Sequence, residues 1–395
     1  MTQKRRVVEA LAVRYFKRRA GKAAHPDARD AVHFLNPDER RALRRIEYLA
    51  VGRAAIVGAV CAGLGAIANV ALQPLLGDDP SRASWGRWAE FMLLTLLAAL
   101  PLVAIELSLI YWNAIDSVHQ LAAAAGLPLF RAKEVGQDVV RHAGDIVDDE
   151  DEIFAAVLAR AALEIPNPPR PMFGIDPRRE ASRLRILLAT LVYKAKVSLT
   201  KFVARTLLTR IFGRAALRAW IPFVAVPITA LWDALVCRRA LREARLRAIG
   251  PSAASELLGF VLAPHPEPSP GLREALMRAI GTAVVRSRDF HPNLIELLDD
   301  LKSRIGETDA EALDDVPRFI ECLRRLLPAE QKAALHTLVI ACVLDGRVRQ
   351  GERAIMTRAF RVCGRPPPRI QVLVLQRALL SGDQLAPKML DLLTP

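Results

Sequence analysis

Two long runs without charged residues dominate the hydropathy pattern of this chain. Residues 54–76 contain no charged side chain, and residues 91–112 contain one, Glu106. As a helix, either run would be about 33 Å long, which is enough to cross a hydrocarbon core of roughly 30 Å. A connection of 14 residues, 77–90, separates them. The pattern predicts a transmembrane helical hairpin, and the alternative is a hairpin buried in the core of a soluble protein.

The charges on either side of the hairpin predict its orientation. Residues 1–53 carry 14 Lys and Arg against six Asp and Glu, whereas the connection 77–90 carries two Arg and three acidic residues. Because basic segments are retained in the cytoplasm, both termini are expected there. Aromatic side chains near the ends of the runs agree with this topology, since Trp and Tyr favour the membrane interface. They are Tyr48, Trp85, Trp88, Tyr111 and Trp112.

The rest of the chain has the pattern of an all-α protein. Ala, Leu and Arg dominate, and apolar positions recur with helical spacing. Asn36-Pro37-Asp38-Glu39 predicts a helix start, with Asn as N-cap and Pro in the first turn. The fold expected is a two-helix transmembrane hairpin with a cytoplasmic helical domain and a C-terminal helical module. The expected divisions are 1–53 (basic cytoplasmic helices), 54–112 (hairpin), 113–263 (cytoplasmic or membrane-proximal domain), 264–328 (helical connector) and 329–395 (module).

A third apolar segment, 219–236, has one charged residue, Asp233, and two prolines, Pro222 and Pro227. Its 18 residues are few for a membrane span. We interpret it as the core helix of the cytoplasmic domain, with a re-entrant or interfacial element as the alternative. A full crossing would move the basic stretch 238–247 outside the cell, against the charge rule.

Two features of the hairpin suggest functional contacts. Gly and Ala recur at four-residue spacing in 54–76, which permits close approach of the second run or of another copy of the chain. Glu106 is a carboxyl group at membrane depth, and such groups are by default functional candidates. It lies six residues from the end of its run, so a partly solvated structural role is equally open.

Basic residues near the predicted membrane surface point to a lipid partner. Residues 181–218 carry nine Lys and Arg and no acidic residue, with apolar positions at helical spacing. A basic amphipathic helix is typical of a membrane surface, although a helix with a solvated basic face on its own domain is an equal alternative. Anionic lipid is preferred over nucleic acid because the hairpin holds the chain near the bilayer. The predicted head-group contacts are Arg44, Arg45, Arg53, Lys194, Lys201 and Arg205.

Motifs of enzyme chemistry are absent from the sequence. It has no glycine-rich nucleotide loop, no HExxH and no GxSxG. The five cysteines form no CxxC pair, which argues against a disulfide framework or a zinc site and fits a reducing compartment. The acidic run 145–152 lacks the spacing of a calcium loop. An unrecognised catalytic site would be sought at 289–300, where His291 precedes Pro292 and is expected to cap a helix.

The stretch Leu338-Val-Ile-Ala-Cys-Val-Leu-Asp345-Gly346 is an apolar helix that ends in Asp-Gly, and Glu352 opens the next helix. Gly346 suits a left-handed position, Asp345 can accept hydrogen bonds from turn amides, and Glu352 suits the helix N-terminus. Residues 329–393 resemble the TerB-like, or tellurite-resistance-like, domains. This resemblance implies a small helical module of the stress response, with a divalent metal held by acidic residues in some members. The matching positions are Asp345 and Glu352.

The middle of the chain is similar to a family of predicted bacterial membrane proteins that carry such a tail. The similarity rests on residues 194–250, on Arg278-Ala-Ile-Gly281 and on His291-Pro292-Asn293. It implies a location in the bacterial inner membrane and brings no activity with it.

The function expected is that of a non-enzymatic, membrane-anchored adaptor or scaffold in envelope, metal or stress physiology. It would bind a protein partner through its cytoplasmic helices and anionic lipids through its basic residues, without a cofactor other than the metal that the resemblance implies. The alternative is an oligomeric transporter or channel component that uses the hairpin and Glu106.

Overall fold

The computed structural model describes residues 11–18, 34–76, 84–125, 155–163, 175, 214–306 and 312–394. Most side chains between 214 and 225 lie outside this description. The described residues are almost entirely helical and contain no strand, which confirms the all-α prediction. The helices are α2 (Pro37–Leu72), α3 (Trp85–Ala124), α6 (Arg214–Leu262), α7 (Pro270–Ser287), α8 (Pro292–Ile305), α9 (Val316–Arg325), α10 (Pro328–Val343), α11 (Gln350–Val362), α12 (Arg369–Ser381) and α13 (Pro387–Asp391), with the short 3-10 turn η1 (Gln73–Leu76) after α2.

The chain divides into two compact units. The hairpin unit contains residues 44–118 and 182–242, and the globular unit contains residues 1–43, 119–181 and 243–395. Segment 219–236 therefore groups with the hairpin helices, whereas its pattern favoured the core of the cytoplasmic domain. The segment lies in the first part of α6, a helix of 49 residues. This helix belongs to the hairpin unit up to residue 242 and to the globular unit from residue 243.

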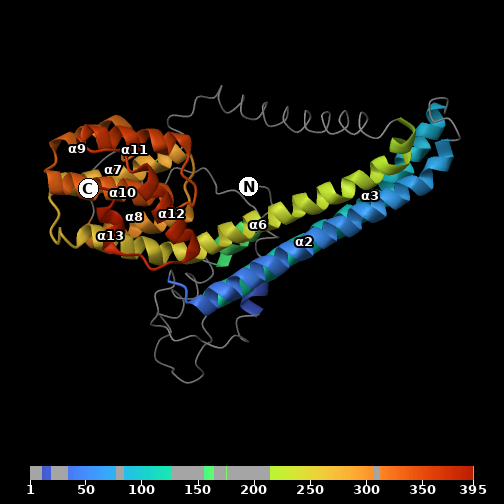
Figure 1. Cartoon of the computed structure of the whole chain (residues 1–395), viewed down its shortest axis with the longest axis horizontal. Helices are drawn as coiled ribbons and strands as arrows, with labels where there is room; N and C mark the ends of the chain where they lie inside the picture. Colours follow the sequence, from blue (N-terminus) through green and yellow to red (C-terminus); the bar gives the residue numbers. More distant parts are fainter. Residues whose placement is uncertain are drawn as a thin grey trace, which may run out of the picture. The chain divides into compact units, whose positions relative to one another are not determined.

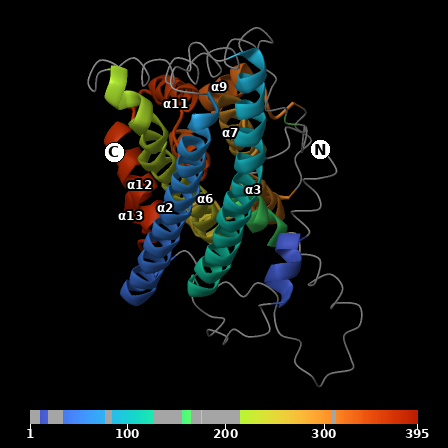
Figure 2. The same ribbon diagram turned by 90° about the vertical axis from the view of Figure 1, so that its right-hand side faces the viewer.

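The hairpin unit is built on α2 and α3, which run side by side (Figure 1 and Figure 2). Both helices are long and apolar enough to cross a membrane. Large apolar side chains point outward, as on a lipid-facing helix, whereas a soluble core would bury them. Exposed examples are Ile56, Val60, Leu64 and Ile67 on α2 and Leu93, Leu96, Leu97 and Leu100 on α3.

One buried amide joins α2, α3 and α6. The Asn113 side chain of α3 donates a 2.9 Å hydrogen bond to the Ala50 carbonyl of α2. The same Nδ2 atom lies 3.7 Å from the Cys237 sulfur of α6. Because Asn113 is only 8% exposed, this bond replaces one that water would make, and it fixes the register of α2 against α3.

The globular unit packs around α7 and α10. Most residues of both helices are buried, and α7 also contacts α8, α9 and α11. Side chains on both sides of residue 328 share one hydrophobic core. The sequence placed a boundary at 328, between a connector and a C-terminal module. Residues 333–343 of α10 are buried on every face of the helix, and α7 provides most of their cover.

Local side-chain chemistry marks the helix starts, and the cap predicted at His291 is confirmed. The Ser269 hydroxyl accepts the Leu272 amide hydrogen, and Pro270 opens α7. His291 Nδ1 accepts the Asn293 amide hydrogen at 3.2 Å, and Pro292 opens α8, as expected for a capping residue before proline. At the start of α2, Glu39 accepts the amide hydrogen of Asn36 at 2.7 Å. Local sequence therefore sets where these helices begin.

Candidate functional site

The turn between α10 and α11 carries the two acidic residues singled out by the sequence. Asp345 Oδ1 accepts the amide hydrogen of Arg347 at 2.9 Å, and Glu352 Oε2 accepts that of Arg349 at 2.6 Å. Gly346 has φ of +69°, in the left-handed region that favours glycine. These contacts confirm the roles predicted for the three residues in the turn. Both carboxyl groups are buried, with Asp345 6% and Glu352 1% exposed.

Arg349 connects this turn to the loop between α7 and α8 through polar contacts. Its guanidinium donates to the Ser287 carbonyl and lies 3.2 Å from the Asp289 carboxylate and 3.7 Å from that of Asp345. Asp289, part of the acidic segment 289–300, therefore has a structural role as the partner of Arg349. Sequence reasoning did not identify the contact, because 60 residues separate Arg349 from Asp289.

Burial changes the ionisation of both acids in the turn. It raises the pKa of Glu352 to about 8, and the nearby Asp345 carboxylate contributes in the same direction. Burial also raises the pKa of Asp345, although the Arg347 amide and the Arg349 guanidinium oppose that shift. Glu352 Oε1 is buried without a hydrogen-bond partner among the described residues, which agrees with a neutral carboxyl group at pH 7.

A second polar contact lies at the start of α8. Glu243 Oε1 is 2.9 Å from His291 Nε2 and 3.0 Å from Arg247 Nε. Burial opposes ionisation of Glu243, but His291 and Arg247 outweigh it and lower its pKa to about 2. Asn293 donates to the backbone carbonyls of Leu246 and Leu344. Together these bonds hold α6, α8 and the end of α10 in one arrangement.

Asp345 and Glu352 do not by themselves form a complete metal site. Calcium and magnesium take six or more oxygen ligands, and here each carboxyl group already accepts an amide hydrogen beside the Arg349 cation. In the part of the chain that the structure describes, no group of three or more His, Cys, Asp or Glu side chains is arranged for a metal. The divalent metal implied by the family resemblance stays a prediction.

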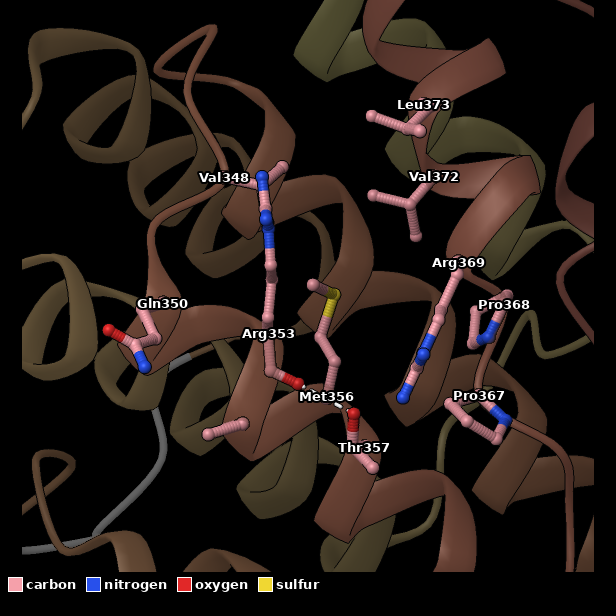
Figure 3. A pocket seen from close by; sticks show the side chains of 11 residues that line it. Val348, Gln350, Arg353, Met356, Thr357, Pro367, Pro368, Arg369, Val372 and Leu373 are labelled. Atoms are coloured by element: carbon pink, nitrogen blue, oxygen red, sulfur yellow. Dashed lines mark hydrogen bonds between the residues drawn. The ribbon is translucent and has the colours of Figure 1, made fainter.

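A groove that no sequence pattern indicated lies between α11 and α12. Its volume is about 690 Å³. Figure 3 shows Met356 between Arg353 and Arg369, which come from opposite walls, with Val372 and Leu373 on the α12 side. Its lining also includes Val348, Gln350, Ala354, Thr357, Pro367 and Pro368, and none of the lining residues is acidic.

In the hairpin unit, Glu106 has a partner that sequence analysis did not name. The carboxyl groups of Glu106 on α3 and Asp233 on α6 interact, and Gly58 of α2 lies against Asp233. In the sequence, the signal for this contact was that each acid is the only charged residue of its apolar segment. Two isolated acids in neighbouring apolar helices can pair, but sequence alone does not say which helices are neighbours.

The predicted lipid contacts fall into two groups. Arg44, Arg45 and Arg53 are exposed on α2, as a head-group contact requires. Lys194, Lys201 and Arg205 lie outside the described residues, as does the acidic run 145–152. Lipid binding itself stays a prediction.

Comparisons with known proteins add no family to these observations. No protein-family model, no curated protein and no solved structure matches the chain. The geometry of the groove, of the α10–α11 turn and of the carboxyl pair is therefore the basis for inferring a function.

Proposed function

We propose that this chain is a non-enzymatic adaptor, anchored by its helical hairpin, that binds a segment of a partner protein in the groove between α11 and α12. The observation that carries the proposal is the groove itself, which is apolar at its floor and open to solvent. Volumes of about 300–1,000 Å³ are typical of ligand-binding pockets, and about 690 Å³ falls within that range.

The residues of the groove suit a protein ligand. Met356 is 5% exposed at the floor, and methionine adapts its shape to different apolar partners. The outer face of α12 continues the apolar surface with Ile370, Leu373 and Val374, which are 74, 56 and 51% exposed. Contiguous exposed apolar side chains on a water-facing unit are typical of a binding surface.

Charge indicates the kind of segment that binds. Arg353 and Arg369 are exposed at the two walls, and no acidic residue lines the groove. A partner segment with apolar anchors beside Asp or Glu would match both features, because complementary charges favour one partner over others. An apolar segment flanked by Lys or Arg would be repelled.

The hairpin supports the anchoring part of the proposal. Its two helices are long and apolar enough to cross a membrane. We propose that they hold the chain in a bacterial inner membrane with both termini in the cytoplasm, and that basic residues such as Arg44 and Arg45 contact anionic lipids. A role in envelope, metal or stress physiology is part of the proposal, and it rests on the resemblance of residues 329–393.

Site-specific photo-crosslinking in the full-length chain tests the adaptor. A benzophenone amino acid replaces Leu373 in the groove or, as a control, Arg324 on the exposed face of α9. We expect a covalent adduct with one protein from position 373 and none from 324. Arg369→Glu should weaken the adduct several-fold, whereas Arg358→Glu, exposed on α11 outside the groove, should not. Equal adducts from 373 and 324, or none from 373, would refute the proposal.

The carboxyl pair of the hairpin unit favours a second candidate, a component of an oligomeric transporter or channel. In this case Glu106→Gln abolishes function, whereas removal of the groove by Leu373→Asp has no effect. The adaptor predicts the reverse order of effects, so the two variants measured together distinguish the candidates.

A further inference from the structure

Three helices of the hairpin unit bring two carboxyl groups together. Glu106 comes from α3 and Asp233 from α6, and their side chains interact. Asp233 is 7% exposed, and its Oδ2 atom is buried without a hydrogen-bond partner among the described residues. A buried carboxylate oxygen without a donor is costly, so the structure leaves a position for a ligand at this atom.

Gly58 of α2 provides the space for this arrangement. A Cβ atom at Gly58 would overlap Asp233 Oδ2 and lie 3.1 Å from its Cγ and 3.3 Å from the Thr229 carbonyl oxygen. By contrast, a Cβ at Gly63 would meet no atom within 4 Å. Of these two glycines in the first apolar run, only Gly58 is required by the packing, and what it accommodates is the Asp233 carboxyl group.

The charged groups near the pair include no cation among the residues that the structure describes. Glu106 and Asp233 act on each other, and both act on the Cys61 thiol of α2. Among the described residues, no Lys, Arg or His forms an ion pair with either carboxyl group. Two carboxylates close together in an apolar surrounding cannot both remain ionised, because their repulsion and the loss of hydration act in the same direction.

We propose that Glu106 and Asp233 form a proton-binding site in which the two carboxyl groups share a single proton. One carboxyl group donates this proton to an oxygen of the other, so the pair carries one negative charge instead of two. A proton needs only two oxygens, whereas a metal cation would need several more ligands than the two carboxyl groups provide. The site is independent of the groove, and it does not depend on whether the adaptor proposal holds.

Infrared spectroscopy of the full-length chain in lipid nanodiscs tests the site through the C=O stretch of protonated carboxyl groups. Difference spectra between wild type and the Glu106→Gln, Asp233→Asn double variant, recorded across pH, isolate this pair. We expect two titration steps at least about one pH unit apart, because the groups are coupled. Each single variant should keep one step, located between the two wild-type steps. Glu90→Gln, which alters an exposed acid of the same helix α3, should leave the spectra unchanged.

Three outcomes would overturn the proposal. Steps in the single variants that coincide with the wild-type steps would mean that the groups are not coupled. Identical spectra of wild type and the double variant would mean that no such site exists. Loss of the protonated band at constant pH when sodium replaces potassium would assign the site to a metal cation.

A glycine pair tests the geometry while keeping both carboxyl groups. Gly58→Ala should displace Asp233 and bring the two titration steps together, whereas Gly63→Ala in the same helix should leave them unchanged. Both variants gain the same helix propensity, so a difference between them reports the contact with Asp233. Far-ultraviolet circular dichroism confirms that each variant is folded. Unchanged steps in Gly58→Ala would refute the proposed arrangement.

Discussion

The globular unit and the hairpin unit accommodate buried and partly buried acidic side chains in different ways. In the globular unit, Glu243 contacts His291 and Arg247, and Asp345 accepts an amide hydrogen. In the hairpin unit, Glu106 and Asp233 interact with each other, without an ion pair to any described cation. In the first arrangement, a cation or an amide hydrogen compensates each carboxylate. The second leaves the carboxyl groups dependent on protonation, which is the difference that gives the hairpin unit a candidate site.

Close packing around a glycine occurs in both units. Disturbing it should give the largest change in the free energy of unfolding that we expect. In α7 a Cβ at Gly281 would overlap the carbonyl oxygen of Leu313 and lie 2.8 Å from its carbon. In α6 the nearest atom to a Cβ at Gly259 would be Arg304 Nη1, at 3.4 Å, at the end of a flexible side chain.

Gly281→Ala should lower the free energy of unfolding by about 3 kcal/mol, because backbone atoms at Leu313 cannot move away easily. Gly259→Ala should change it by no more than about 1 kcal/mol, in the stabilising direction, since alanine favours helix. Urea unfolding of the full chain in detergent, followed by circular dichroism, measures both. Equal stabilities would mean that packing at glycine matters in the hairpin unit only.

Glu352 is the acid of the globular unit that most resembles the hairpin pair, and a variant can sharpen the comparison. Its pKa of about 8 in the folded chain compares with an ordinary value of 4.5. The folded state therefore keeps a proton that the unfolded state releases, so stability falls as pH rises from about 4.5 to about 8. Glu352→Gln retains an acceptor for the Arg349 amide and should raise stability at pH 7.5 by about 2 kcal/mol.

Thermal unfolding across pH checks this expectation. The variant should lose the decline between pH 4.5 and 8 that wild type has. Glu330→Gln is the matched control, because Glu330 is also the third residue of its helix, α10, and caps it through the Leu327 amide. A wild-type profile that is flat between pH 6.5 and 8 would contradict a neutral Glu352 and would leave charge compensation as the rule for the globular unit.

His336 gives a smaller effect of the opposite sign. Burial lowers its pKa to about 4, and the nearby Lys332 adds to that shift. The unfolded state binds more protons between pH 4 and 6.5, so this residue makes stability rise with pH over that range. His336→Gln keeps a side chain that can bond to Thr394 Oγ1, now 2.8 Å from His336 Nε2, and should remove a rise of about 1 kcal/mol.

The same thermal unfolding series checks His336, with Glu352→Gln as the background from which the opposing Glu352 slope has been removed. His265, which is not in the core, provides the control substitution His265→Gln. If the slope persists in His336→Gln, then a group other than His336 produces it, and the proposed role of His336 is refuted.

Prediction from sequence succeeded where the physics is local. The runs 54–76 and 91–112 gave two helices long and apolar enough to cross a membrane. His291 before Pro292, Gly346 after α10 and Glu352 at the start of α11 took the predicted roles, because a cap depends on residues within one turn. By contrast, the groove has walls from α11 and α12, and its existence depends on the angle between those helices.

What the sequence by itself determined is the kind of structure at each position: helices, their starting residues, an apolar hairpin and an isolated carboxyl group at Glu106. These follow from spacing and from chemistry within a few residues. Only the tertiary structure decided that Asp233 lies beside Glu106, that Arg349 binds Asp289, and that α10 packs on α7. Such contacts join residues that are distant in the chain, and they are selected by the packing of whole helices, which no local pattern specifies.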